Sequence, residues 1–354
     1  VNLSVKNKNL SLLGVLLLIT SPRIFADSFY NSRDIIFLSF IIFSTYYSLK
    51  ALNFGGYKYI ILAALFSSLA ANTRVIGCYM PLMTIFFYYF NCKDKIIFYK
   101  TFKFSFIYLF FFITFLFISW PHLWESPFKN FFSSISEFTN LPFDIYILYL
   151  GEYISSRHVP WHYFFVWFFI STPILYVLFI TVGLFYTLRT FIVNLVNIDE
   201  KSEFLLWKDN LQMNEIFILF TFLIPIFTVI MLNSTLYTGW RHLYFVYPAL
   251  IFIAVKGIFN LQNLFSKTGQ MIIYLSIFLQ VIFVIYTIIL IHPLQAVYFN
   301  SASKNIVKNS FFYDYWGLAN KITIEKLLNE EKHLKPIKIA TSSLTDLNKT
   351  KFIM

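Results

Sequence analysis

Charged residues are scarce in this chain of 354 residues. Asp, Glu, Lys and Arg together make up 13% of it, whereas hydrophobic residues make up 58%. Soluble globular domains carry roughly 25% charged residues, and a soluble protein of this length could not cover its surface with so few. The composition therefore excludes a soluble globular enzyme, a disordered protein and a fibrous protein. It predicts an integral membrane protein.

Cysteines are few, and the common catalytic motifs are absent. Two cysteines, Cys78 and Cys92, cannot form a disulfide framework or a Cys-rich metal site. The sequence contains no glycine-rich phosphate loop, HExxH, GxSxG or nucleotide-binding fingerprint. The spacing of the histidines does not predict a zinc site, so we assign no metal ligands and leave metal dependence open. If the chain is a transferase, these absences favour a lipid-linked donor over a nucleotide sugar.

Apolar segments dominate the rest of the chain. A helix that spans a membrane needs roughly 20 residues, and the shorter segments must recruit flanking residues to reach that length. We predict an all-α polytopic membrane protein, a helical bundle with about nine spans. The apolar segments cover residues 10–20, 35–49, 58–72, 75–90, 102–120, 163–188, 215–233, 244–260 and 270–291.

Lys and Arg are distributed unevenly over the loops between these segments. The loops on the same side as the N-terminus carry about twice as many of them as the opposite loops, and cytoplasmic loops carry such an excess. We therefore predict a cytoplasmic N-terminus and an outer C-terminus. The net charge of +11 follows this loop pattern, so it indicates membrane topology and not a nucleic-acid partner.

The predicted topology divides the chain into a transmembrane domain, residues 1–291, and an outer tail, residues 292–354. In the tail we expect a helix over 316–332 followed by a strand-like segment at 337–341. Residues 128–139 have phenylalanines near helical spacing with polar residues between them, which predicts an amphipathic helix at the membrane interface. The outer loops are 21–34, 121–162 and 234–243.

Ionisable residues gather at the predicted outer ends of the spans, where charges are costly and usually functional. Asp34 begins a span, and it either faces the positive end of the helix dipole or contacts substrate. Arg74 either extends to the membrane interface or contacts a phosphate. Arg241, followed by His242, is either a boundary charge or a bidentate phosphate ligand, for which a guanidinium suits better than an ammonium.

A second group of candidates lies in the long outer loop. Arg157, His158 and His162 fall within six residues, and histidines near an arginine can move a proton and bind an anion. Their neighbours Trp161 and Tyr163 fit the aromatic belt of an ordinary membrane boundary. The segment therefore predicts either a site contribution or a boundary loop.

Five stretches of informative sequence follow one another along the chain. They are PRIFADSFYNSRD (22–34), ANTR (71–74), GEYISSRHVPWHYFFVWFFISTP (151–173), GWRHLYFVYP (239–248) and HPLQAVYFN…FFYDYWGLANKITIEKLL (292–328). In this order they resemble the polytopic, lipid-phosphate-sugar-dependent glycosyltransferases of family 39. The resemblance is to the protein mannosyltransferase and aminoarabinose transferase type.

The resemblance implies a GT-C-type bundle with its active site at the outer face of a bacterial inner membrane. It implies inverting transfer of a hexose or pentose from a polyprenyl-phosphate sugar to a hydroxyl of a protein, lipid or glycan acceptor. By resemblance, Asp34 is the catalytic carboxylate, in acceptor or base-supporting contact, and Arg241 and His242 bind the lipid phosphate with help from Arg74. Loop-ordering or sugar-contacting roles fall to Arg157, His158 and His162.

The chain departs from the family pattern at its beginning. In the family the first outer loop carries an acidic motif that supplies the base, whereas loop 21–34 resembles the second acidic region. We therefore expect the chain to be incomplete at the N-terminus, and also at the C-terminus. Two other classes stay open: a transporter or flippase of a lipid-linked or anionic substrate, and a non-catalytic paralogue. Charges at the outer ends of the spans, not near their middle, favour the enzyme.

Overall fold

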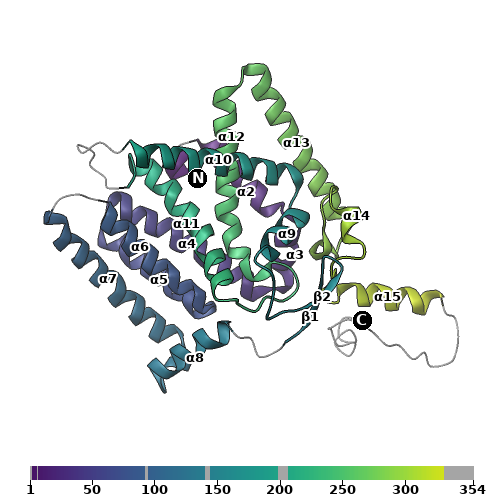
Figure 1. Cartoon of the computed structure of the whole chain (residues 1–354), viewed down its shortest axis with the longest axis horizontal. Helices are drawn as coiled ribbons and strands as arrows, with labels where there is room; N and C mark the ends of the chain where they lie inside the picture. The colour runs from purple at the N-terminus through teal and green to yellow at the C-terminus, as the bar shows by residue number, and fades with distance from the viewer. Residues whose placement is uncertain (1, 6, 92–94, 140–143, 198–205, 331–354) are drawn as a thin grey trace.

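The computed structural model describes residues 2–5, 7–91, 95–139, 144–197 and 206–330 (Figure 1). Within these ranges the regular structure is helical apart from one two-stranded antiparallel hairpin. The prediction of an all-α membrane protein is confirmed. The predicted strand-like segment 337–341 lies outside the described residues.

The helices before the hairpin form the first part of the described chain. They are α1 (Asn2–Val5), α2 (Lys8–Ile19), α3 (Pro22–Tyr30), α4 (Ser32–Phe54), α5 (Tyr57–Thr73), η1 (Val75–Cys78), α6 (Tyr79–Phe90), α7 (Lys95–Ser119), η2 (Pro121–Leu123) and α8 (Pro127–Thr139).

The hairpin and the helices after it complete the described part of the chain. They are β1 (Tyr146–Tyr149), β2 (Glu152–Ser155), α9 (Tyr163–Ser171), α10 (Ile174–Val196), α11 (Asn210–Met231), η3 (Arg241–Val246), α12 (Tyr247–Leu264), α13 (Lys267–Leu290), η4 (Gln295–Val297), α14 (Lys304–Val307) and α15 (Leu318–Glu330).

Six of the described helices are long and apolar enough to cross a membrane, and the bent pair α2–α3 makes a seventh if it is one span. The predicted number of nine spans is therefore not confirmed. Helix α5 has 17 residues, and Val75–Phe90 is another short apolar helix, so both are short for a bilayer. The six are α4, Tyr99–Ser119 of α7, α10, α11, Arg241–Leu264 and α13.

Prolines mark two breaks between helices, of which only one lies inside a predicted apolar segment. The predicted segment 163–188 is two helices, because Pro173 lacks an amide hydrogen and Thr172 before it is extended. Pro22 occupies the start of α3, and α2 and α3 meet there at 63°. The second break turns α3 toward the charged residues described below.

Helix α12 lies at the centre of the bundle, and 78% of the apolar stretch within Arg241–Leu264, which joins η3 and α12, is buried. It packs directly against α10 through two glycines, Gly183 and Gly257. A Cβ atom on Gly183 would lie 1.9 Å from the carbonyl oxygen of Ile253, and one on Gly257 would lie 2.4 Å from that of Phe179. Small residues allow this close approach of helix backbones, which is a common packing mode in membranes.

Gly183→Ala is expected to destabilise the bundle by about 1–3 kcal/mol, because the methyl group forces the two helix backbones apart. Thermal melting of the purified protein in detergent would measure the loss as a lower midpoint. Phe185→Leu is the matched control, since Phe185 lies on the same helix and is exposed. Equal midpoints for Gly183→Ala and the wild type would contradict the close packing.

The loop and tail elements gather at the lower edge of Figure 1. The predicted amphipathic helix 128–139 is α8, and the predicted tail helix 316–332 is α15 within the described residues. Tyr149 of the hairpin forms a β-bridge with Phe311 of the tail, and Gly151 donates its amide hydrogen to the Ser310 carbonyl at 3.0 Å. The tail is therefore held against the long loop.

Candidate functional site

A polar pocket of about 340 Å³ lies where the start of α4, the break after α5 and the start of η3 meet. Three arginines and one carboxylate line it. Trp316 of the tail reaches the same pocket from the other side. The six residues that carry its polar chemistry are Asn31, Arg33, Asp34, Arg74, Arg241 and His242.

Asp34 is placed by the N-terminal cap of α4. The side-chain oxygen of Asn31 accepts the Asp34 amide hydrogen at 3.3 Å, and the Asn31 amide group donates to Oδ2 of Asp34 at 2.8 Å. Asparagine is among the residues that cap helices best, and a carboxylate in the first turn faces the positive end of the helix dipole. Asp34 is 2% exposed, so its charge depends on these partners and on the arginines.

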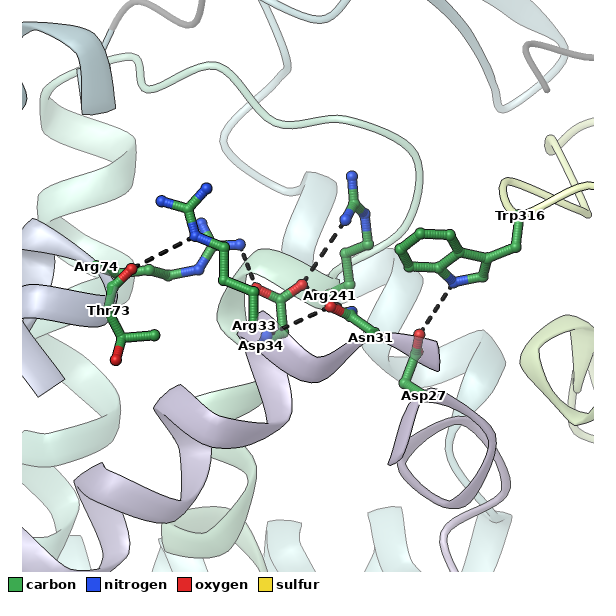
Figure 2. Close-up of polar contacts among 8 residues, drawn as sticks. All are labelled: Asp27, Asn31, Arg33, Asp34, Thr73, Arg74, Arg241 and Trp316. Carbon is green, nitrogen blue, oxygen red and sulfur yellow. Dashed lines mark hydrogen bonds and ion pairs between the residues drawn. The ribbon is translucent and has the colours of Figure 1, made fainter. Parts of the chain in front are cut away.

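Two arginines approach the Asp34 carboxylate from opposite sides (Figure 2). Arg74 lies between α5 and η1 and has an extended backbone. Its guanidinium forms an ion pair with Oδ1 of Asp34. Nη1 of Arg241, the first residue of η3, lies 3.7 Å from Oδ2. Arg33 donates from Nε to the Thr73 carbonyl at 3.4 Å. The sequence-predicted residues Asp34, Arg74 and Arg241 therefore converge.

The charge of the described pocket is positive. Arg33, Arg74 and Arg241 face a single carboxylate, that of Asp34. Burial lowers the pKa of Arg74 and the neighbouring Asp34 raises it, but a guanidinium stays charged at neutral pH. Arginines that offer several donors in a planar fork suit phosphate oxygens. The single carboxylate balances only one of the three guanidiniums, so the pocket keeps a positive charge and can bind an anion.

His242 lines the same pocket, as the sequence predicts for a residue next to Arg241. Its ring lies 5.6 Å from the ring of Tyr237, edge to face. Helix η3 presents Arg241 and His242 together because the chain enters it through Gly239, whose φ of +79° favours glycine.

The second sequence-predicted group lies away from the pocket. Arg157, His158 and His162 do not line it. Instead, Nδ1 of His162 and the Tyr149 hydroxyl form a hydrogen bond at 2.6 Å, and burial raises the pKa of Tyr149 to about 12. These contacts hold the hairpin against the start of α9. His162 therefore packs within the long loop and does not line the pocket.

Sequence reasoning missed five residues that line the pocket, namely Tyr30, Asn31, Ser32, Tyr237 and Trp316. For Asn31 a signal was present, because an asparagine before a helix start predicts a cap. For Trp316 there was none, since only the tertiary fold brings the tail to this place.

Among the described residues, no three His, Cys, Asp or Glu side chains lie where they could hold a metal ion. The pocket chemistry in these ranges is that of guanidinium, carboxylate, imidazole and aromatic groups.

Comparison with known proteins gives one match. Residues 4–124 match the dolichyl-phosphate-mannose-protein mannosyltransferase family. No match was found among curated proteins or among solved structures. The matched segment includes Asp34 and Arg74, whereas Arg241 and His242 lie beyond it. It confirms the resemblance seen in the sequence and points to glycosyltransferase activity in a multi-pass membrane protein. Over residues 4–124, the chain is therefore similar to the dolichyl-phosphate-mannose-protein mannosyltransferase family, which is of the GT-C type.

Proposed function

We propose that this chain transfers a sugar from a polyprenyl-phosphate donor to an acceptor hydroxyl. The observation that carries the proposal is the convergence of Arg74 and Arg241 on the buried Asp34. We place the pocket at the outer face of a bacterial inner membrane, with a cytoplasmic N-terminus. The acceptor is a hydroxyl of a protein, lipid or glycan.

The charge of the pocket suits the leaving group of this reaction. A polyprenyl-phosphate sugar is a phosphodiester with one negative charge. When the acceptor oxygen attacks the anomeric carbon with inversion, the bond to the phosphate oxygen breaks and its electron pair stays on the phosphate. The leaving phosphate gains one negative charge, and three guanidiniums against one carboxylate stabilise it more than they stabilise the donor.

Asp34 has two tasks in this proposal. It holds Arg74 and Arg241 in place in the free protein. When the donor phosphate draws these guanidiniums to itself, an oxygen of Asp34 becomes available to accept the proton of the acceptor hydroxyl. Asp34 is the only carboxylate among the described residues that line the pocket.

The remaining sequence-predicted residues take supporting roles. We propose that His242 contacts the phosphate beside Arg241, since both line the pocket. The bond between His162 and Tyr149 favours loop ordering over sugar contact for Arg157, His158 and His162.

An apolar cavity supports a lipid-linked donor. It has a volume of about 340 Å³, lies between α2, α4, α11 and α12, and is lined by no charged side chain of the described chain. Phe245, one turn after Arg241, lines it, and its ring lies 4.6 Å from that of Phe37, one turn after Asp34. We propose that the apolar chain of the donor lies there while its phosphate reaches the arginines.

A transfer assay in membranes tests the proposal. Polyprenyl-phosphate hexose with a labelled sugar would be offered to the chain with protein, lipid and glycan acceptors in turn. We expect label to move to one acceptor class, and expect Arg241→Ala to lower the transfer rate by about 10²–10³-fold, as for loss of one charge-stabilising donor. Movement of intact labelled lipid across the bilayer without sugar transfer would favour the transporter class instead.

A further inference from the structure

The tail reaches the pocket through a buried contact with α3. The indole N–H of Trp316 donates to Oδ1 of Asp27 at 3.0 Å (Figure 2). Asp27 is 2% exposed, and a buried carboxylate accepts a strong hydrogen bond. This bond fixes the position of Trp316 relative to α3, although 289 positions of sequence separate the two residues.

The same tail segment contacts Arg241. The guanidinium carbon of Arg241 lies 4.1 Å from the ring centre of Tyr315 and 5.2 Å from that of Trp316. Both are cation–π distances. Oδ2 of Asp34 lies 3.7 Å from Nη1 of the same guanidinium. Arg241 therefore lies between two tail rings and the Asp34 carboxylate.

Arg241 depends on these rings because it has few other partners. Its Nε is buried without a hydrogen-bond partner, and its contact with Asp34 is longer than that of Arg74. An arginine side chain has many rotamers, so ordering it requires a contact that restricts them. The rings of Tyr315 and Trp316 supply that contact, and Trp316 is itself held by Asp27.

We propose that Asp27 is a positioning residue of the donor site. It holds Trp316, and through it the Tyr315–Trp316 pair, so that Arg241 stays directed into the pocket where the donor phosphate binds. The inference rests on the proposed function. Asp27 does not touch the donor; it acts as the hydrogen-bond acceptor that anchors the tail.

Binding of a short-chain polyprenyl phosphate to the full chain in nanodiscs tests this role. Asp27→Leu and Trp316→Phe each remove the hydrogen bond, and each is expected to weaken binding about tenfold, the effect of losing one hydrogen bond to a charged group. Asp27→Asn keeps an acceptor oxygen and is expected to bind like the wild type. In the transfer assay, kcat/KM for the donor should fall in the first two variants and stay at the wild-type value in Asp27→Asn, because a displaced Arg241 stabilises the leaving phosphate less.

Trp124→Phe is the matched control. Trp124 also donates its indole N–H, to the Phe117 carbonyl at 2.7 Å, but it does not line the pocket, so this variant should bind like the wild type. Hydrogen exchange of residues 312–317 reports on the tail itself. We expect faster exchange there in Asp27→Leu and wild-type exchange in Asp27→Asn.

The outcomes separate this inference from the proposed function. Faster exchange of 312–317 in Asp27→Leu with unchanged binding would show that the contact only folds the tail, and would overturn the inference while the proposed function stands. Asp27→Asn binding as poorly as Asp27→Leu would overturn the acceptor role. If the wild type binds no polyprenyl phosphate, the proposed function fails first.

Discussion

Replacing Arg74 by alanine is expected to lower the transfer rate by about 10²–10³-fold, the same range as for Arg241→Ala, and to lower the stability of the fold as well. Arg74 makes the closer of the two guanidinium contacts to Asp34. Its removal takes away a phosphate ligand and also leaves a buried carboxylate with a weaker partner. The second effect destabilises the fold by about 3–5 kcal/mol, as for other broken buried pairs.

Arg33→Ala is the matched control for this prediction. Arg33 also lines the pocket, but its hydrogen bond is to the Thr73 carbonyl and not to Asp34, so we expect a smaller loss of transfer and little loss of stability. Arg74→Lys keeps the charge without the planar fork. We therefore expect its transfer rate and its stability to lie between those of Arg74→Ala and the wild type. Arg74→Ala protein that melts and transfers like the wild type would contradict the site.

Asp34→Asn is expected to separate donor binding from chemistry. The substitution keeps the shape of the side chain and removes its charge, so three guanidiniums are left without an opposing carboxylate in the described pocket. The donor phosphate no longer competes with Asp34 for Arg74 and Arg241. We therefore expect donor binding to stay equal or become tighter, whereas kcat falls by about 10²–10⁴-fold with the loss of the proton acceptor.

The measurement is the pair of kcat and donor Kd for Asp34→Asn beside Arg74→Ala. We expect the donor Kd to rise in Arg74→Ala and to stay equal or fall in Asp34→Asn, because the first substitution removes a ligand of the phosphate and the second removes its competitor. If Asp34→Asn loses donor binding as strongly as Arg74→Ala, Asp34 only holds the arginines and the proton goes elsewhere.

Much of the fold follows from the apolar pattern of the sequence. Apolar runs bounded by loops predicted the positions of the helices, because a bilayer requires every backbone polar group to be satisfied within a helix. The number of these helices that are long enough to span a membrane could not be predicted so well. Pro173 divides one predicted apolar run into two helices, and the helix that begins at Pro22 bends away from the helix before it. Hydrophobicity alone indicates neither the division nor the bend.

The candidate site was predictable in part. Asp34, Arg74 and Arg241 each stand at the end of an apolar segment, where a charge is informative, and the structure brings them together. Their pairing needed the tertiary fold, since the three residues come from segments that lie far apart in the sequence. His162 carried a similar sequence signal, yet its bond to Tyr149 keeps it in the loop.

The contribution of the tail could not be predicted from local sequence. Trp316 follows the aromatic stretch FFYDY (311–315) and begins the predicted tail helix, but neither feature indicates a contact with the pocket. It reaches Asp27 and Arg241 because the β-bridge between Tyr149 and Phe311 holds the tail against the hairpin. Contacts of this kind depend on pairing between distant segments.

The most direct measurement compares three lipids of equal chain length for binding to the wild type in nanodiscs. They are a polyprenyl-phosphate hexose, a polyprenyl phosphate and the uncharged polyprenol. We predict that both phosphates bind, that the polyprenol binds at least tenfold more weakly (roughly the share of one charged hydrogen bond), and that Arg74→Ala with Arg241→Ala removes the difference. Equal binding of all three lipids, or a phosphate preference that survives the double substitution, would contradict a phosphate site at these arginines.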